Sequence, residues 1–355
     1  SSLSSSHVAD DTRAHGARTR VVFVDRLRFI AAFQMLQGHT VSALLAPSYR
    51  VGDLYAVWSA ARGLTSVAFL FTAGLSFGLA SGRPFASATA RSSARRARVL
   101  RALRLIALGY VLHAPLQLLW DPSNARAAFE RFVAVDVLQC IGVSLLALEA
   151  LAFALRSSRS FSFAAAAVGG TLLALAPLSH GAGLPHGIAD YLSSDDGSLF
   201  PLLPWSAHVF IGAACAAFVR VNARTSLKLM AAAFALLALR AFVHEALVVD
   251  QLDRLACVMV ASAALALSTK RPPAWLETLA GQTLFLYVFH VLLVYGDGIG
   301  LVERIGPRLA PPAAIAVAGA VVIVSFALAQ LYRRIGLPRA DESLGSRLAA
   351  ASETR

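Results

Sequence analysis

The sequence predicts an all-α, polytopic membrane protein with about ten transmembrane helices and with its N- and C-termini in the cytoplasm. The chain has 355 residues, of which 57% are hydrophobic and 15% are charged, whereas a soluble domain carries about 25% charged residues. Its mean hydropathy is +0.65. Apolar runs of about 20 residues, each long enough to cross a membrane core, recur along the whole length. An uneven distribution of basic residues over the loops sets the orientation.

Taken in order, these apolar runs form a single transmembrane domain that covers residues 21–332. Residues 1–20 are expected to be a disordered cytoplasmic tail, and residues 333–355 a second cytoplasmic tail. The first five spans share no visible repeat with the last five. The predicted spans are 21–46, 63–81, 99–119, 133–155, 162–178, 201–219, 227–248, 252–268, 278–296 and 310–332.

The orientation follows from counting lysine and arginine on each side of these spans. With the N-terminus inside, 24 of the 32 basic residues fall in inner segments and 8 in outer ones, as the positive-inside rule requires. The net charge of +12 is therefore a topology signal, and nucleic acid is not expected as a partner. We expect a multi-pass protein of the bacterial cell (inner) membrane, in contact with its lipids; the sequence leaves a homodimer open.

The first span carries ionisable residues on one face. Asp25, Arg28, Ala32, Met35 and His39 follow spacings of three and four, which places them along one side of a helix. Such side chains cost about 2.5–3.5 kcal/mol each inside a bilayer, so they are functional candidates. The structural alternative is an Asp25–Arg28 pair at the interface and a hydrogen bond from His39 to a neighbouring helix.

Further polar candidates fall in the outer half of the predicted membrane domain. His113 lies in the third span and Asp136 at the outer end of the fourth. Tyr287 and His290 are three residues apart in the ninth span, so they share a helical face. A buried hydrogen bond between this tyrosine and this histidine is the structural alternative for the pair.

An arginine cluster precedes the third span on the predicted inner side. Arg95 shares a helical face with Arg98, and Arg101 continues it. Guanidinium groups bind phosphates in a bidentate manner. The alternative is a positive-inside signal attracted to anionic lipid. The cluster consists of Arg91, Arg95, Arg96, Arg98, Arg101 and Arg104.

Other features of the spans have mainly structural interpretations. Gly74, Gly78 and Gly82 are spaced four apart, which allows close helix packing. Glu149, in the inner half of the fourth span, would relay protons or pair with an arginine of the third. No metal site is predicted, because the three cysteines lack paired spacing and the external His180 has no diagnostic partner spacing.

The first span, VDRLRFIAAFQMLQGH, resembles the opening of the heparan-α-glucosaminide N-acetyltransferase-like family, within the broader transmembrane acyltransferase superfamily. Asp25, Arg28, Met35 and His39 match the family pattern, and Phe29 stands where a glycine is usual. Four later segments are also similar to family motifs and keep their order. These segments are 69–80, 135–146, 201–213 and 279–290.

The resemblance implies transfer of an acetyl (acyl) group from cytoplasmic acetyl-CoA to a sugar amine or hydroxyl on the far side of the membrane. It marks His39 as catalytic, either as a general base or as a nucleophile that carries the acetyl group. An oxyanion that forms at the carbonyl needs a hydrogen-bond donor. His290, Tyr287 and His113 are the candidates for it.

In this scheme the inner arginines would hold the CoA phosphates. The cofactor-binding candidates are Arg28, Arg95, Arg98 and Arg101, and the structural candidates are Asp25, His113 and Asp136. A ten-helix transporter of a small metabolite is the competing class. Such proteins often contain two repeats of five spans, and none is visible here. A membrane scaffold without catalysis would have no need of histidines on three separate spans.

Overall fold

The computed structural model is all-helical in the part of the chain that it describes, apart from one isolated bridge between Leu45 and Leu309. It describes residues 21–82, 88–115, 123, 125–155, 157–178, 184–185, 187–194, 197–220, 224–268 and 270–335. The predicted N-terminal tail, most of the C-terminal tail and His180 fall outside these residues.

At least one described helix overlaps each predicted span, although the seventh span, 227–248, ends at Arg240 in the structure. The described helices are α2 (Val22–Leu44), α3 (Asp53–Ser81), α4 (Ala88–Leu112), α5 (Ala125–Val133), α6 (Val137–Ala154), α7 (Ser158–Ala174), α8 (Ala189–Leu192), α9 (Leu202–Arg220), α10 (Thr225–Arg240), α11 (Ala246–Leu267), α12 (Ala274–Ala280), α13 (Thr283–Tyr295), α14 (Leu301–Ile305) and α15 (Pro311–Arg334).

By length and apolar composition, four described helices could cross a membrane, namely α3, α6, α9 and α15. The bent pair of α12 and α13 would be a fifth span if it is counted as one. The chain is thus a helical membrane protein. Ten spans with both termini in the cytoplasm stay a prediction.

Some helices extend into segments that the sequence assigns to loops. α3 begins at Asp53 and not at residue 63, and α11 begins at Ala246 and not at residue 252. α4 likewise begins before its arginine cluster. Charged side chains end a predicted membrane span, but most of them are compatible with a helix. The extra turns carry charged residues into the helical bundle.

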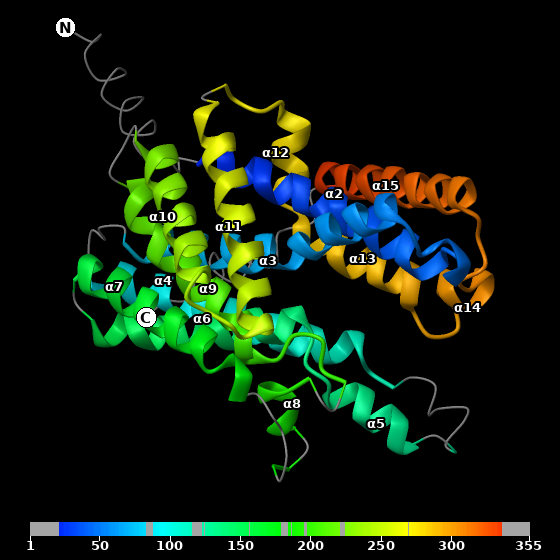
Figure 1. The fold of residues 1–355 in the computed structure, drawn as a ribbon, viewed down its shortest axis with the longest axis horizontal. Helices are drawn as coiled ribbons and strands as arrows, with labels where there is room; N and C mark the ends of the chain where they lie inside the picture. Colours follow the sequence, from blue (N-terminus) through cyan, green and yellow to red (C-terminus); the bar gives the residue numbers. More distant parts are fainter. Residues whose placement is uncertain are drawn as a thin grey trace, which may run out of the picture.

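The central helix of the fold is α3. It packs against α6 and α9 on one side and against α2 and α11 on the other. In Figure 1, α2 lies with α13 and α15 at the right, while α4, α6, α7 and α9 lie at the lower left. α10 pairs with α11 along its length. Residues on α3 therefore contact helices from both the early and the late parts of the chain.

Glycines allow the close contact between α3 and α9. A Cβ atom on Gly74 would overlap the carbonyl group of Val209, and Gly78 meets the α9 backbone in the same way. From the opposite side, Gly212 of α9 faces the backbone of α3. The predicted close packing at these glycines is confirmed, whereas Gly82 is the residue that ends α3.

The ninth predicted span, 278–296, is not one straight helix, which corrects the prediction. α12 and α13 meet at an angle of 67°. At the break, the N–H of Gln282 bonds to the carbonyl of Leu279 at 3.0 Å, a tighter turn than in an α-helix. Non-helical backbone at membrane depth is tolerated where it faces protein or a cavity. Thr283, the first residue of α13, lines the cavity described below.

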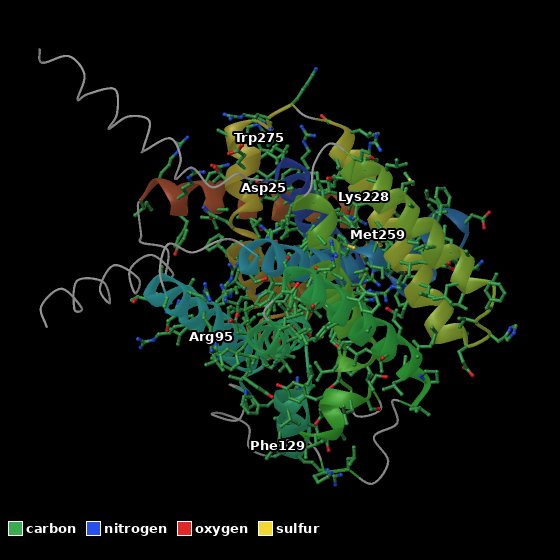
Figure 2. The ribbon with its side chains drawn as sticks, turned by 90° about the vertical axis from the view of Figure 1, so that its left-hand side faces the viewer. Asp25, Arg95, Phe129, Lys228, Met259 and Trp275 are labelled. Carbon is green, nitrogen blue, oxygen red and sulfur yellow. The ribbon has the colours of Figure 1, made fainter. Side chains whose placement is uncertain are left out.

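The starts of α2 and α12 lie at the same end of the fold. Asp25 and Trp275 lie near each other in Figure 2. The guanidinium of Arg26 donates to the carbonyl oxygen of Ser268 at 3.0 Å and to that of Lys270. Because these two carbonyls follow the end of α11, the start of α2 lies beside the end of α11.

Candidate functional site

A cavity of about 420 Å³ lies between α2, α3, α4, α6, α11 and α13. Its arginine end is lined by Arg28, Arg98 and Arg101, and its histidine end by His39, Arg62, Asp136 and Tyr287.

The two ends of the cavity are well separated. Arg28 and His39 lie on the same helix, so the helical rise separates their backbones by about 16 Å. Apolar side chains, including Met35 and Ile141, line the stretch between the two ends. The cavity therefore joins two polar sites through an apolar passage.

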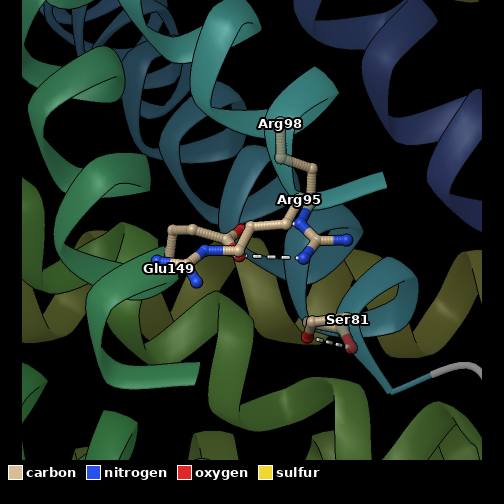
Figure 3. A network of polar contacts seen from close by, with 5 residues as sticks. Ser81, Arg95, Arg98 and Glu149 are labelled. Carbon is tan, nitrogen blue, oxygen red and sulfur yellow. Dashed lines mark hydrogen bonds and ion pairs between the residues drawn. The ribbon is translucent and has the colours of Figure 1, made fainter. Parts of the chain in front are cut away.

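At the arginine end, Arg98 is fixed by Glu149 (Figure 3). Its Nε and Nη2 atoms donate to the carboxylate at 2.6 and 2.9 Å, and Arg95 lies 3.8 Å from the same carboxylate. Glu149 is only 5% exposed. A buried carboxylate needs such partners to replace its water. Of the two interpretations of Glu149, the ion pair with an arginine of α4 is confirmed.

The other predicted cofactor-binding arginines differ in their surroundings. Arg95 lies outside the cavity lining, with its guanidinium 4.0 Å from the ring centroid of Phe153. Arg28 donates to the hydroxyl of Ser76 at 2.6 Å. Arg101 lines the cavity and makes no hydrogen bond or ion pair with any described residue. Arg101 is therefore available to an anion at the arginine end.

At the histidine end, His39 and His290 are hydrogen-bonded. His39 Nδ1 lies 2.9 Å from His290 Nε2, and His290 Nδ1 lies 3.0 Å from the carbonyl oxygen of Leu286. A carbonyl oxygen only accepts, so His290 carries its proton on Nδ1. In a neutral ring its Nε2 then accepts the Nδ1 proton of His39. This arrangement leaves a free lone pair on the Nε2 of His39, and the His39 side chain is one of those that line the cavity.

Tyr287 and Asp136 form a second buried pair at this end. The hydroxyl of Tyr287 donates to Asp136 Oδ2. The other carboxylate oxygen accepts from the N–H of Val137 at 2.7 Å, and Gln139 completes a capping box at the start of α6. The rings of Tyr287 and His290 lie 5.5 Å apart between centroids. The structural alternative for this pair, a hydrogen bond between the tyrosine hydroxyl and the histidine, is wrong, because the hydroxyl donates to Asp136.

Two of the predicted structural residues are not among the residues that line the cavity. Asp25 is buried near the start of α2. His113 follows the end of α4, where its Nδ1 lies 2.9 Å from the carbonyl oxygen of Gly109. In the described part of the chain, no group of three His, Cys, Asp or Glu side chains is placed to hold a metal ion.

Phe29 occupies the position where the resemblance leads one to expect glycine. Its ring packs edge-on against Trp275 at 5.5 Å and against Phe326 at 5.7 Å. The junction between α2, α12 and α15 is therefore filled by aromatic side chains, and the bulkier residue is accommodated there.

Two arginines of the cavity were not predicted as site residues, namely Arg62 on α3 and Arg254 on α11. Arg254 pairs with Asp250 at 2.7 Å and donates to the carbonyl oxygen of Gly63 at 3.2 Å. The sequence places both arginines at the outer edges of spans, where they count as loop charges. A helix start recognised at Asp53 would have placed Arg62 inside the bundle.

The fold and the cavity define an integral membrane protein with a polar site enclosed among its helices. The family model described as "Heparan-alpha-glucosaminide N-acetyltransferase, catalytic" matches residues 20–249, more than half of the chain. The chain belongs to this family of N-acetyltransferases, so the resemblance seen in the sequence is confirmed. Comparison of the chain with curated proteins and with solved structures found no match.

The matched residues end near the start of α11. They include His39, Arg62 and Asp136, whereas Tyr287 and His290 lie beyond them on α13. α13, which follows the matched region, therefore supplies the histidine that bonds to His39 and the tyrosine that bonds to Asp136.

Proposed function

We propose that this protein is a membrane-embedded acyltransferase that moves an acetyl group from acetyl-CoA to the amine or hydroxyl of a sugar acceptor. The observation that carries the proposal is the continuous cavity, which joins the arginine end to His39. Membership of an N-acetyltransferase family supports the same chemistry. A transporter would share the cavity but not this family membership.

In this proposal acetyl-CoA enters at the arginine end. Arg101 and Arg28 contact its phosphates, since guanidinium–phosphate hydrogen bonds are charge-assisted and geometrically specific. Arg98, held by Glu149, adds a further positive group. The pantetheine arm then lies along the apolar passage beside Met35, which directs the thioester toward His39. We place this arginine end on the cytoplasmic side of a bacterial inner membrane, as the charge distribution predicts.

At the histidine end, the acceptor is activated by His39. Its Nε2 takes the proton of the sugar amine or hydroxyl as that group attacks the thioester carbonyl, a step that general base catalysis accelerates by about 10²–10⁴-fold. Alternatively, Nε2 attacks the thioester itself and carries the acetyl group to the acceptor. In both routes His290 orients the ring through its bond to Nδ1.

The test supplies acetyl-CoA, labelled in the acetyl group, to the cytoplasmic face of sealed inverted membrane vesicles that contain glucosamine. We expect labelled N-acetylglucosamine to accumulate inside vesicles that carry the protein, and not in vesicles without it. Brief exposure to labelled acetyl-CoA without acceptor separates the two routes, because only the covalent route labels the protein. Vesicles that bind acetyl-CoA but form no acetylated sugar, with glucosamine on either side, would contradict the proposal.

A further inference from the structure

The histidine end contains a guanidinium group that the proposed chemistry has not yet used. Arg62 lines the cavity on α3. Its Nε atom is buried and has no hydrogen-bond partner, and the side chain makes no hydrogen bond or ion pair with any described residue. The residue as a whole is half-buried, and a buried N–H without a hydrogen-bond partner is costly. Arg62 is therefore placed where a ligand in the cavity can complete its hydrogen bonds.

The side chain of Arg62 is held close to His39. A Cβ atom on Gly38 would lie 2.8 Å from Cγ of Arg62 and 3.1 Å from its Cδ, so the stem of the arginine lies against the residue that precedes His39. On its other side, the guanidinium lies 5.9 Å from the ring centroid of Trp58, and Trp58 donates to Gln37 at 3.2 Å. The absence of a side chain at Gly38 gives Arg62 this position.

The donors that the sequence suggested for an oxyanion are otherwise engaged. Tyr287 donates its hydroxyl hydrogen to Asp136. His290 donates to the carbonyl of Leu286, and its other nitrogen accepts from His39. His113 is not among the residues that line the cavity. Among the described residues that line this end, the side chains of Arg62 and Thr65 have a buried donor without a partner, and of the two Arg62 carries the positive charge that matches a developing negative charge.

We propose that Arg62 is a catalytic residue that donates hydrogen bonds to the carbonyl oxygen of the acetyl group as that oxygen becomes negatively charged. This inference rests on the function proposed above. When the acceptor amine or hydroxyl attacks, a bond forms to the carbonyl carbon, the π electrons move to oxygen beside Arg62, and His39 takes the acceptor's proton. On collapse the C=O bond re-forms, the C–S bond breaks, and His39 protonates the departing CoA thiolate.

The test measures acetyl transfer from acetyl-CoA to glucosamine in vesicles that carry Arg62→Gln, together with acetyl-CoA affinity. Loss of one oxyanion donor costs about 10²–10³-fold in kcat, and we expect such a fall with the KM for glucosamine and the Kd for acetyl-CoA unchanged. Arg62→Lys keeps the charge but loses the planar fork, so its loss should be smaller.

A second variant perturbs the position of Arg62 without altering any reacting group. Gly38→Ala places a methyl group against the stem of Arg62, and we expect a lower kcat in folded protein. The matched control is Gly319→Ala on α15, where an added Cβ meets no atom within 4 Å. This pair decides the question if Arg62→Gln fails to fold: equal turnover in Gly38→Ala and Gly319→Ala would overturn the proposal.

Two further outcomes would also reject the role of Arg62. In one, Arg62→Gln retains both the kcat and the KM of the wild type. In the other, it retains the wild-type kcat but raises the KM for glucosamine, which would make Arg62 part of acceptor binding. Wild-type vesicles that transfer no acetyl group would instead reject the proposed function itself, so the two failures are distinguishable.

Discussion

Replacing His39 by asparagine tests the two imidazole nitrogens separately, because it keeps a donor at the position of Nδ1 and removes Nε2. The Nδ1 of His39 lies 2.9 Å from His290 Nε2, and the amide nitrogen of asparagine stands in nearly the same place on the side chain. His39→Asn can therefore still donate to His290. It has no atom at the position of Nε2, the nitrogen that we propose to act on the acceptor or the thioester.

The expected magnitudes follow from these two contributions. The retained hydrogen bond is worth about 1 kcal/mol, so the thermal stability of His39→Asn should stay close to that of the wild type. Loss of a general base lowers the rate by about 10²–10⁴-fold, which raises the barrier by about 2.7–5.4 kcal/mol. The variant should thus be folded, should bind acetyl-CoA at the far end of the cavity, and should be nearly inactive.

The assay is acetyl transfer to glucosamine, with thermal unfolding and acetyl-CoA binding measured on the same preparation. His113→Asn is the matched control, because that histidine is not among the cavity-lining residues, and its turnover should be unchanged. Folded His39→Asn protein that keeps more than about a tenth of wild-type turnover would refute the reasoning, since a missing general base should cost about a hundredfold or more.

Three further predictions concern the cofactor, the packing and the topology. Arg101→Gln should raise the Kd for acetyl-CoA and leave kcat at saturation unchanged, because its guanidinium lines the cavity and has no described partner. Gly74→Ala should lower the unfolding free energy by about 1–3 kcal/mol, as expected for overpacking, because its Cβ would overlap a carbonyl group of α9. Reporters fused after residues 190 and 224 should be external and cytoplasmic respectively.

Each of these has a control or a contrary outcome. Arg96→Gln removes the same charge from α4 outside the cavity lining, so an equal effect on acetyl-CoA affinity would indicate non-specific attraction. In Gly170→Ala an added Cβ meets nothing within 4 Å, and its stability should not fall. A cytoplasmic reporter signal after residue 190 would contradict the ten-span topology.

Several residues of the site could be predicted from the sequence of the first span. Its spacing of three and four predicts one functional face, and Arg28, Met35 and His39 of that face line the cavity. The sequence also selected His290 as a candidate, and that residue is hydrogen-bonded to His39. Helical periodicity and the scarcity of charge in a membrane were sufficient for these predictions, because both act locally.

Arg62 and Arg254 show where the same reasoning is insufficient. Each was assigned to the outer edge of a span because charged residues are costly in lipid. That cost falls on side chains that face lipid, whereas these two line a cavity. Contacts between helices that are far apart in the chain, such as that of Arg254 with Gly63, decide which side of a helix faces the cavity. Such contacts cannot be predicted from a single sequence by local patterns.

The backbone contact between α3 and α9 has a mechanical consequence for access to the cavity. With Gly74 and Gly212 facing each other's helices across this contact, there is no layer of side chains between the two helices that could deform. α3, which lines the passage, is therefore held rigidly against α9. α2 and α13 also line the passage, and α13 is joined to α12 at a 67° bend. If the passage widens to admit a sugar, we expect α13 to move, with the bend as its pivot, while α3 keeps Arg62 in place.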